Sequence, residues 1–258
     1  MRLKEIRDYR ELLWNLVLTE LKLRYRDSLL GFLWTGLNPL FSLLILSFVF
    51  SRIVRFANLE HYTIFLFSGL TSWLMIQQTA VIAIGSIVNN QSLIKKIYVP
   101  KIVFPLSNVL ARYVDHAILL VLLLGFMPIF GVKMGWSLLF LPVAVILHFA
   151  FGLGLSLLLA TAQVKVRDVQ NAAGILFQAI FYLTPIIYPL EVLGERIRPY
   201  FEWNPFYLFL RLIRDPVWGG TLPPWEIISA AAGIAAVVLG LGLWVFARRE
   251  KYFVYDLS

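Results

Sequence analysis

Residues 137–162 read SLLFLPVAVILHFAFGLGLSLLLATA, a run that holds no Asp, Glu, Lys or Arg. An α-helix needs about 20 predominantly apolar residues to cross the hydrocarbon core of a bilayer, which is roughly 30 Å thick. This run is longer than that, and His148 is its only ionisable side chain. It therefore predicts a membrane-spanning helix, around which the rest of the chain can be interpreted.

Five further segments are also apolar enough to span a membrane. Of the 258 residues, 60% are hydrophobic and 15% are charged, whereas a soluble domain carries about 25% charged residues. No polar stretch between the apolar segments is long enough to fold separately. The sequence thus predicts one all-α polytopic membrane domain over residues 1–258. Its six predicted spans are residues 33–54, 62–88, 102–130, 137–162, 172–188 and 226–247.

The loop charges predict the orientation. With the N-terminus inside, the inner segments carry fifteen Lys and Arg residues and the outer segments carry seven. Cytoplasmic loops are enriched in Lys and Arg, so we expect both termini in the cytoplasm. The same bias accounts for the net charge of +8 without any nucleic-acid partner. Residues 1–30 form the cytoplasmic start, residues 31–247 the spans and residues 248–258 a cytoplasmic tail.

Two segments outside the spans are amphipathic. Residues 6–24 place apolar side chains on one helical face and charges mostly on the other, which predicts a helix in the cytoplasmic interface. Residues 190–225 are too polar to span and too apolar for a loose loop, and Asn204–Pro205 and Asp215–Pro216 punctuate them. We expect two short re-entrant helices there, buried in protein or lining a wet cavity.

Residues 89–101 connect the second and third predicted spans inside the cell. Gln91 and Ser92 can cap a short helix, with Leu93, Ile94 and Ile97 on its apolar side and Pro100 at its end. Such a helix suits docking into a soluble partner. A loop that is simply rich in Lys is the alternative.

The spans contain few features of catalysis or ion coupling. Arg112 and Asp115 lie three residues apart in the third span and predict a structural ion pair on one helix face. With so few further charges in the spans, we do not expect coupling to an ion gradient. Glycines in the fourth and sixth spans predict close helix contact; they are Gly152, Gly154, Gly240 and Gly242.

No catalytic or metal-binding set is expected. There are no cysteines, and the three histidines lack ligand spacing. No Gly is followed by Lys, so the chain has no phosphate-cradling loop of the Gly-x-x-x-x-Gly-Lys type. If ATP drives this protein, another polypeptide must bind it.

Three stretches together resemble a known family. They are ELKLRYRDSLLGFLWTGLNP at 20–39, LIKKIYVPK at 93–101 followed by PLSN at 105–108, and Arg167–Asp168 followed by LTPIIYPL at 183–190 and Asn204–Pro205. This combination resembles the permeases of type-two ABC exporters for polysaccharide, which carry O-antigen, capsule or teichoic acid. The similarity extends over essentially the whole chain.

The resemblance implies a homodimer of six-span permeases with two copies of an ATPase subunit, in a bacterial inner membrane. ATP and Mg would be bound by that subunit and no cofactor by this chain. Residues 6–24 would form the interface helix and residues 190–218 the re-entrant pair. The coupling helix that docks into the ATPase would contain Leu93, Ile94, Lys95, Lys96, Ile97, Tyr98 and Pro100.

The implied cargo is a glycan on a polyprenyl diphosphate lipid. Arg24 and Arg26 suit the diphosphate, since Arg matches phosphate oxygens bidentately, and the Leu30–Gly31 turn would adjoin the entrance. General binding of anionic lipid is the alternative role for these arginines. The candidate pore aromatics, which could instead belong to the interfacial belt, are Trp34, Phe41, Trp73, Phe181, Tyr182 and Tyr188.

Other cargoes and other classes of protein remain open. Within the family, O-antigen is expected, with teichoic acid, capsule or a small lipophilic compound as alternatives. An ATP-independent channel or scramblase would need no ATPase partner. An intramembrane enzyme would need a cluster of acids or histidines at the membrane face, which the sequence does not offer.

Overall fold

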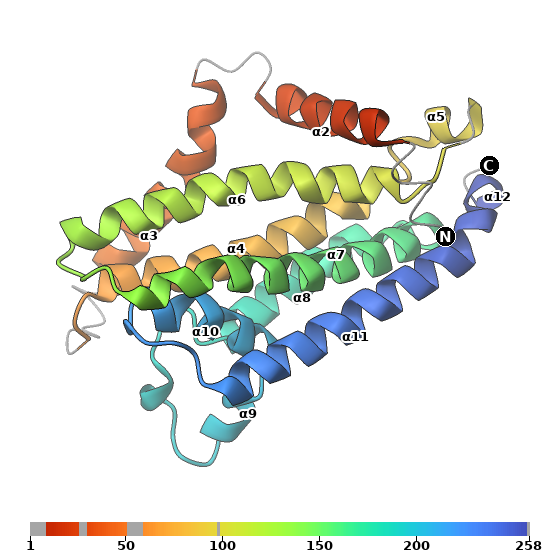
Figure 1. Ribbon diagram of the computed structural model, residues 1–258. Coiled ribbons are helices and arrows are strands. Elements are labelled where there is room, and N and C mark those ends of the chain that lie inside the picture. Colours follow the sequence, from red (N-terminus) through yellow and green to blue (C-terminus); the bar gives the residue numbers. More distant parts are fainter. Residues whose placement is uncertain (1–8, 26–29, 51–58, 97–98, 257–258) are drawn as a thin grey trace.

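The computed structural model describes residues 9–25, 30–50, 59–96 and 99–256, and within these ranges the chain is helical without any β-strand (Figure 1). Short 3₁₀ turns separate several of the helices. The α-helices are α2 (Arg10–Tyr25), α3 (Trp34–Phe48), α4 (Tyr62–Ile84), α5 (Gln91–Lys96), α6 (Val103–Ile129), α7 (Leu141–Lys165), α8 (Val169–Leu183), α9 (Arg198–Glu202), α10 (Pro205–Val217), α11 (Trp225–Arg249) and α12 (Phe253–Asp256).

Four helical segments are long and apolar enough to cross a membrane. They are α4, α6, a segment from Trp136 to Lys165 that includes α7, and a segment from Trp225 to Asp256 that includes α11. These match the second, third, fourth and sixth predicted spans. The first and fifth predicted spans correspond to α3 and α8, which are shorter apolar helices.

The fifth predicted span, residues 172–188, is wrong at its C-terminal end. Helix α8 stops at Leu183, and its 15 residues cover only about 23 Å. Thr184 is extended (φ −107°, ψ 132°) because a residue before proline is pushed out of the helical region. The residues up to Tyr188 form bends that turn back under the bundle.

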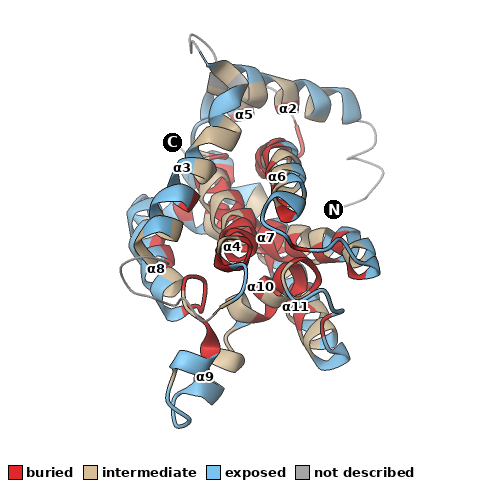
Figure 2. Cartoon of the chain, turned by 90° about the vertical axis from the view of Figure 1, so that its left-hand side faces the viewer, coloured by how far each residue is buried: buried red, intermediate tan, exposed pale blue. Residues whose placement is uncertain are grey.

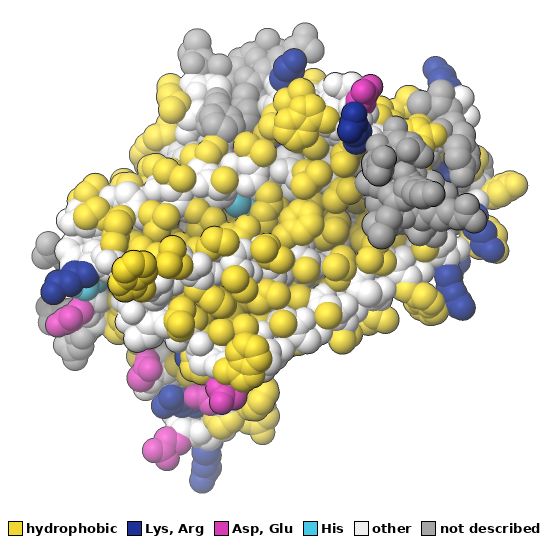
Figure 3. All heavy atoms as spheres, in the orientation of Figure 1, with side chains coloured by type: hydrophobic (Ala, Val, Ile, Leu, Met, Phe, Trp, Pro, Cys, Tyr) yellow, Lys and Arg dark blue, Asp and Glu magenta, His cyan; other side chains and the backbone are white. Residues whose placement is uncertain are grey.

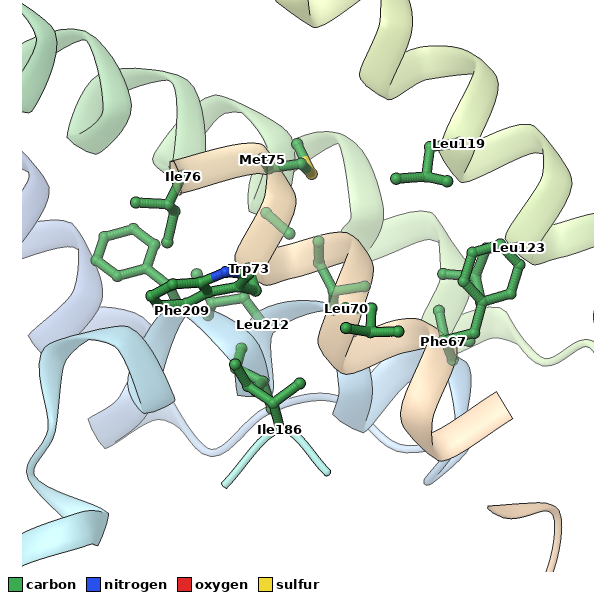
Figure 4. Close-up of a cluster of buried hydrophobic side chains, with 14 of the residues drawn as sticks. Phe67, Leu70, Trp73, Met75, Ile76, Leu119, Leu123, Ile186, Phe209 and Leu212 are labelled. Carbon is green, nitrogen blue, oxygen red and sulfur yellow. The ribbon is translucent and has the colours of Figure 1, made fainter. Parts of the chain in front are cut away.

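Helix α4 lies at the centre of the molecule, where it packs on α3, α6, α7, α8 and α10. Figure 2 shows it buried, with exposed faces of α3, α8 and α9 outside it. Figure 4 shows Phe67, Leu70 and Trp73 of α4 within a cluster that α6 and α10 also supply. A helix that is mostly buried cannot carry charges cheaply, which explains why α4 contains hydroxyl groups, small residues and two half-buried glutamines but no charge.

Glycine allows α7 and α11 to approach closely. A Cβ added to Gly154 would lie 2.6 Å from the backbone carbon of Val238, and one added to Gly242 would lie 2.6 Å from the backbone oxygen of Gly154. The predicted close contact is confirmed for these two glycines. Gly152 faces Thr79 of α4, at 3.1 Å, so it serves a different helix. The prediction is wrong for Gly240, which has no atom within 4 Å of its added Cβ.

Apolar side chains cover the outer face formed by α6, α7 and α11. Figure 3 shows hydrophobic atoms over the middle of this face and most charged side chains towards its ends. Val121, Ile146 and Val237 are all strongly exposed. A continuous exposed apolar surface of this kind is incompatible with water and suits contact with lipid.

Candidate functional site

An ion-paired cluster joins the end of α2 to the middle of α6. Arg24 Nη1 pairs with Asp115 Oδ2, and Arg112 Nη1 donates to the same oxygen at 3.2 Å. The Asp115 side chain is 3% exposed, whereas Arg24 is 18% and Arg112 is 21% exposed. The predicted Arg112–Asp115 pair is confirmed, but Arg24 was not expected to share it. Two guanidinium groups thus share one carboxylate oxygen.

Helix α2 lies along the first half of α6 (Figure 1) and makes a second polar contact there. With its amide oriented to suit this contact, Asn108 donates to the Glu20 carboxylate at 3.0 and 3.2 Å. Burial raises the pKa of the Glu20 carboxyl above its ordinary value, and the positive charge of Arg24 partly offsets that rise. The amphipathic helix predicted at 6–24 is thus anchored to α6 by its polar side chains as well as by buried Val17.

Two connected cavities form a polar groove beside this cluster. Each has a volume of about 370 Å³, and they share Gln78 and Arg112. The first also contains Arg24, Trp34, Asn38 and His116, and the second reaches Asn89 and Gln170 at the ends of α4 and α8. We call these two cavities the polar groove. Amides and guanidinium groups among apolar helices are costly, so their presence on the groove marks it as a functional candidate.

The candidate pore aromatics differ in their exposure. Trp34 lines the polar groove, and Phe41 and Tyr182 are exposed on α3 and α8. Phe181 and Tyr188 are half-buried, and the Tyr188 hydroxyl donates to the Tyr182 carbonyl at 2.9 Å.

Trp73 does not fit the predicted pore lining. Its side chain is 6% exposed, and its ring packs edge-on against Phe177 and Phe181 at centroid distances of 6.1 and 5.6 Å. The sequence suggested Trp73 only as an aromatic residue in a predicted span, and periodicity gave no direction for its side chain.

The turn that precedes α3 is partly described. Leu30 is exposed, and Gly31 has a φ of +46°, a conformation that glycine adopts without strain. Leu30 and Gly31 thus lie just before α3, and neither lines the polar groove. Arg26 lies outside the described residues.

A short helix, α5, lies where the coupling helix is predicted. Ile94 is buried and Leu93 half-buried, while the side chains of Lys95 and Lys96 point into solvent. Pro100 is buried and follows the helix, whereas Ile97 and Tyr98 lie outside the described residues.

The C-terminal helix α12 packs against α5 and supports it. Helix α12 contacts α5, and Phe253 packs against Phe246 in a buried cluster that includes Ile94 and Ile102. The backbone N–H of Lys101 donates to Glu250 Oε1 at 2.7 Å. Sequence reasoning missed this contact, although the apolar Phe253 within a charged tail was a signal for it.

Sequence reasoning also missed Arg214, which is buried under the bundle. Its Nη1 and Nη2 donate to the carbonyls of Pro185 and Ile186, each at 2.7 Å, and its guanidinium lies 3.7 Å from the Phe65 ring centroid. Gly69 leaves the room for it, since an added Cβ would clash with the guanidinium. Arg214 therefore fastens α10 and the bends after α8 to α4.

Two histidines connect spanning helices inside the core. His148 Nε2 lies 2.8 Å from the Ser72 hydroxyl, and His116 Nε2 lies 3.3 Å from the Thr79 hydroxyl. Polar pairs of this kind hold membrane helices together. Among the described residues, no group of three or more His, Cys, Asp or Glu side chains could hold a metal ion.

These features define a polytopic helical membrane protein with a polar groove and a short helix that exposes Lys95 and Lys96. The sequence matches the family described as ABC-2 type transporter over residues 11–218. The chain belongs to this family.

Curated relatives match it along nearly their whole length. The O-antigen export system permease protein RfbA of Myxococcus xanthus is 31% identical over 256 residues, which are 98% of each chain. A protein of the same name from Klebsiella pneumoniae is 30% identical and covers 91% of this chain and 90% of its own. The polysialic acid transport protein KpsM of Escherichia coli is 26% identical, with 92% of each chain covered.

Proposed function

We propose that this chain is the permease subunit of an ATP-driven exporter that moves a lipid-linked polysaccharide across the bacterial inner membrane. The observation that carries the proposal is the polar groove, which combines the Arg24–Asp115–Arg112 cluster with an aromatic ring inside an otherwise apolar bundle. The names of the relatives, which are export and transport proteins for surface polysaccharides, support the cargo class. O-antigen is the cargo we favour.

The groove would receive the anionic head of the lipid carrier. Arg24 and Arg112 place two guanidinium groups at the groove, where both pair with Asp115. A diphosphate would accept hydrogen bonds from both guanidinium groups, since Arg pairs bidentately with phosphate oxygens. Arg26 and the Leu30–Gly31 turn would complete the entrance, and Trp34 would face the first sugar residues.

A separate ATPase would supply the energy, with ATP and Mg bound to that subunit and no catalytic residue in this chain. Helix α5 offers Lys95 and Lys96 to such a partner, in the proposed orientation with both termini in the cytoplasm. We expect two ATPase copies on a homodimer. The exposed apolar faces of α3 and α8, which include Phe41, Phe48 and Ile175, would meet the second copy around the translocation path.

Different cargoes remain as second candidates. The similarity to a polysialic acid transport protein favours capsule as the next choice. Teichoic acid and small lipophilic compounds would require the same groove. An ATP-independent channel or scramblase would lack the ATPase partner altogether.

The proposal is tested by purifying the tagged protein from native membranes and measuring the stoichiometry of co-purifying proteins. We expect an ATPase subunit in a one-to-one ratio. Deleting the chain should also remove one surface polysaccharide and leave its lipid-linked precursor inside the cell. A permease that is active without an ATPase would overturn the mechanism in favour of a channel or scramblase.

A further inference from the structure

A further cavity is lined by residues of α9, α10 and the start of α11. These helices meet at the far end of the molecule from α5 and α12 (Figure 1). The volume of the cavity is about 530 Å³, which is within the range of about 300–1,000 Å³ that small-molecule sites occupy. We call it the outer pocket. In the proposed orientation it faces the outside of the cell, beyond the outer ends of the spans. The polar groove and the outer pocket share no lining residue.

The charges of the outer pocket are nearly balanced. Three arginines and four carboxylates line it, which leaves a small negative excess. Two of the charged pairs are tied in place: Arg198 Nε donates to Glu202 at 2.8 Å, and Arg211 Nη2 donates to Asp215 at 2.8 Å. A phosphate or other anion would be repelled by the excess of carboxylates. A neutral ligand with many hydroxyl groups would find both donors and acceptors.

One of the arginines forms a fixed part of the pocket wall. Arg214 is 5% exposed, and the carbonyls of Pro185 and Ile186 hold its two terminal nitrogens. Its buried Nε has no hydrogen-bond partner among the described residues. An arginine held this way does not move when a ligand arrives, so the wall is pre-organised.

Aromatic rings occupy the mouth and the side of the pocket. Trp203 is 75% exposed, although a large ring would normally be expected to bury its apolar faces. Tyr207 is half-buried beside it, and Trp218 is held by a hydrogen bond from its indole nitrogen to the Glu60 carbonyl at 2.9 Å. Flat rings beside fixed carboxylates and guanidinium groups match the C–H faces and the hydroxyl rim of a pyranose ring.

We infer that the outer pocket is a binding subsite for sugar residues of the exported glycan, which it takes up as the chain emerges. The inference rests on the proposed function, because it assumes that the cargo is a polysaccharide. It adds a second contact for the cargo, selective for neutral sugar units rather than for the lipid diphosphate. Holding the emerging chain outside would oppose its return through the protein.

The test measures binding to the intact permease–ATPase complex in nanodiscs. The probe is the lipid-free oligosaccharide released by mild acid from the surface polysaccharide of the host strain. Calorimetry or saturation-transfer NMR should detect saturable binding, weakened about tenfold or more by Trp203→Ala and largely restored by Trp203→Tyr. Tyr200→Ala is the matched control, because Tyr200 is 79% exposed on α9 and does not line the pocket.

Several outcomes would overturn the inference. The inference fails if the native complex does not bind the probe, or if Trp203→Ala binds it as well as the native complex does. It also fails if Tyr200→Ala loses binding equally, or if phosphatidylethanolamine displaces the probe. The proposed function fails separately: a deletion strain that keeps its surface polysaccharide refutes export. A deletion strain that loses the polysaccharide, together with Trp203→Ala that binds normally, refutes the outer pocket alone.

Discussion

Arg24 and Asp115 form an ion pair although 91 positions separate them in the sequence. This pair fastens the helix ahead of the first predicted span to the middle of the third. The same Asp115 oxygen also accepts from Arg112. One carboxylate that serves two guanidinium groups thus joins α2 to α6, in addition to the Glu20–Asn108 contact.

Replacing Asp115 with Asn should destabilise the protein, because two guanidinium groups would then lose the carboxylate that they share. Loss of one partner from a buried pair costs about 3–5 kcal/mol, and the partial exposure of both arginines reduces this to roughly 2–3 kcal/mol. Thermal unfolding of the purified protein measures the loss. Adding Arg112→Gln to Asp115→Asn should recover part of the stability. If both variants unfold at the native temperature, the cluster does not anchor α2.

Gly154→Ala should lower the unfolding temperature, because the new methyl group would meet the backbone of α11. Inserting a carbon into a filled contact costs about 1–3 kcal/mol. Gly240→Ala is the matched control: it adds the same methyl group on α11 in open space, so only helix propensity changes, in the stabilising direction. Equal effects of the two substitutions would contradict the close approach of α7 and α11.

Reversing the charges of α5 should uncouple the permease from its ATPase. Lys95→Glu with Lys96→Glu leaves the buried Ile94 untouched, so the protein should still insert and fold. We expect reduced recovery of the ATPase in pull-downs and reduced export, measured as surface polysaccharide. Lys133→Glu at the other end of α6 is the control for a change of charge alone. Normal assembly of the α5 variant would exclude α5 as the docking element.

Truncating Phe253 should weaken the packing that positions α5 without changing the exposed side chains of α5. Phe253 is 1% exposed, and a Phe→Ala change in a core costs about 3–5 kcal/mol where the site cannot collapse. Because the cluster includes Ile94, we expect Phe253→Ala to weaken ATPase binding while insertion continues. Tyr255→Ala, at a strongly exposed position of α12, provides the comparison for the tail. A Phe253→Ala protein that binds the ATPase normally would show that α12 does not position α5.

The spans could be predicted because the requirement of the bilayer is local. A long apolar run is sufficient for a helix such as α7, and a spacing of three residues is sufficient for Arg112 and Asp115 to meet. The early end of α8 was also visible in Thr184–Pro185, which was interpreted as apolar sequence rather than as a break. The short helices α5 and α10 followed from their caps and prolines.

The contacts between distant elements could not be predicted in this way. Nothing in the sequence near Arg24 indicates Asp115, and nothing near Arg214 indicates the carbonyls of Pro185 and Ile186. The direction in which Trp73 points was equally inaccessible, because every face of α4 is apolar or neutral. These features depend on how the helices assemble, whereas the spans depend only on the solvent around each one.

The hydrogen bonds from Arg214 to the carbonyls of Pro185 and Ile186 have a consequence for the ion permeability of the proposed exporter at rest. Charge-assisted hydrogen bonds in a dry interior are expensive to break, so α10, the bends after α8 and the outer half of α4 are constrained to move as one rigid body. Segments that move as one body leave fewer openings for ions than segments that move independently. In the proposed exporter, closure by one rigid unit would let idle copies stay in the membrane without loss of the proton gradient.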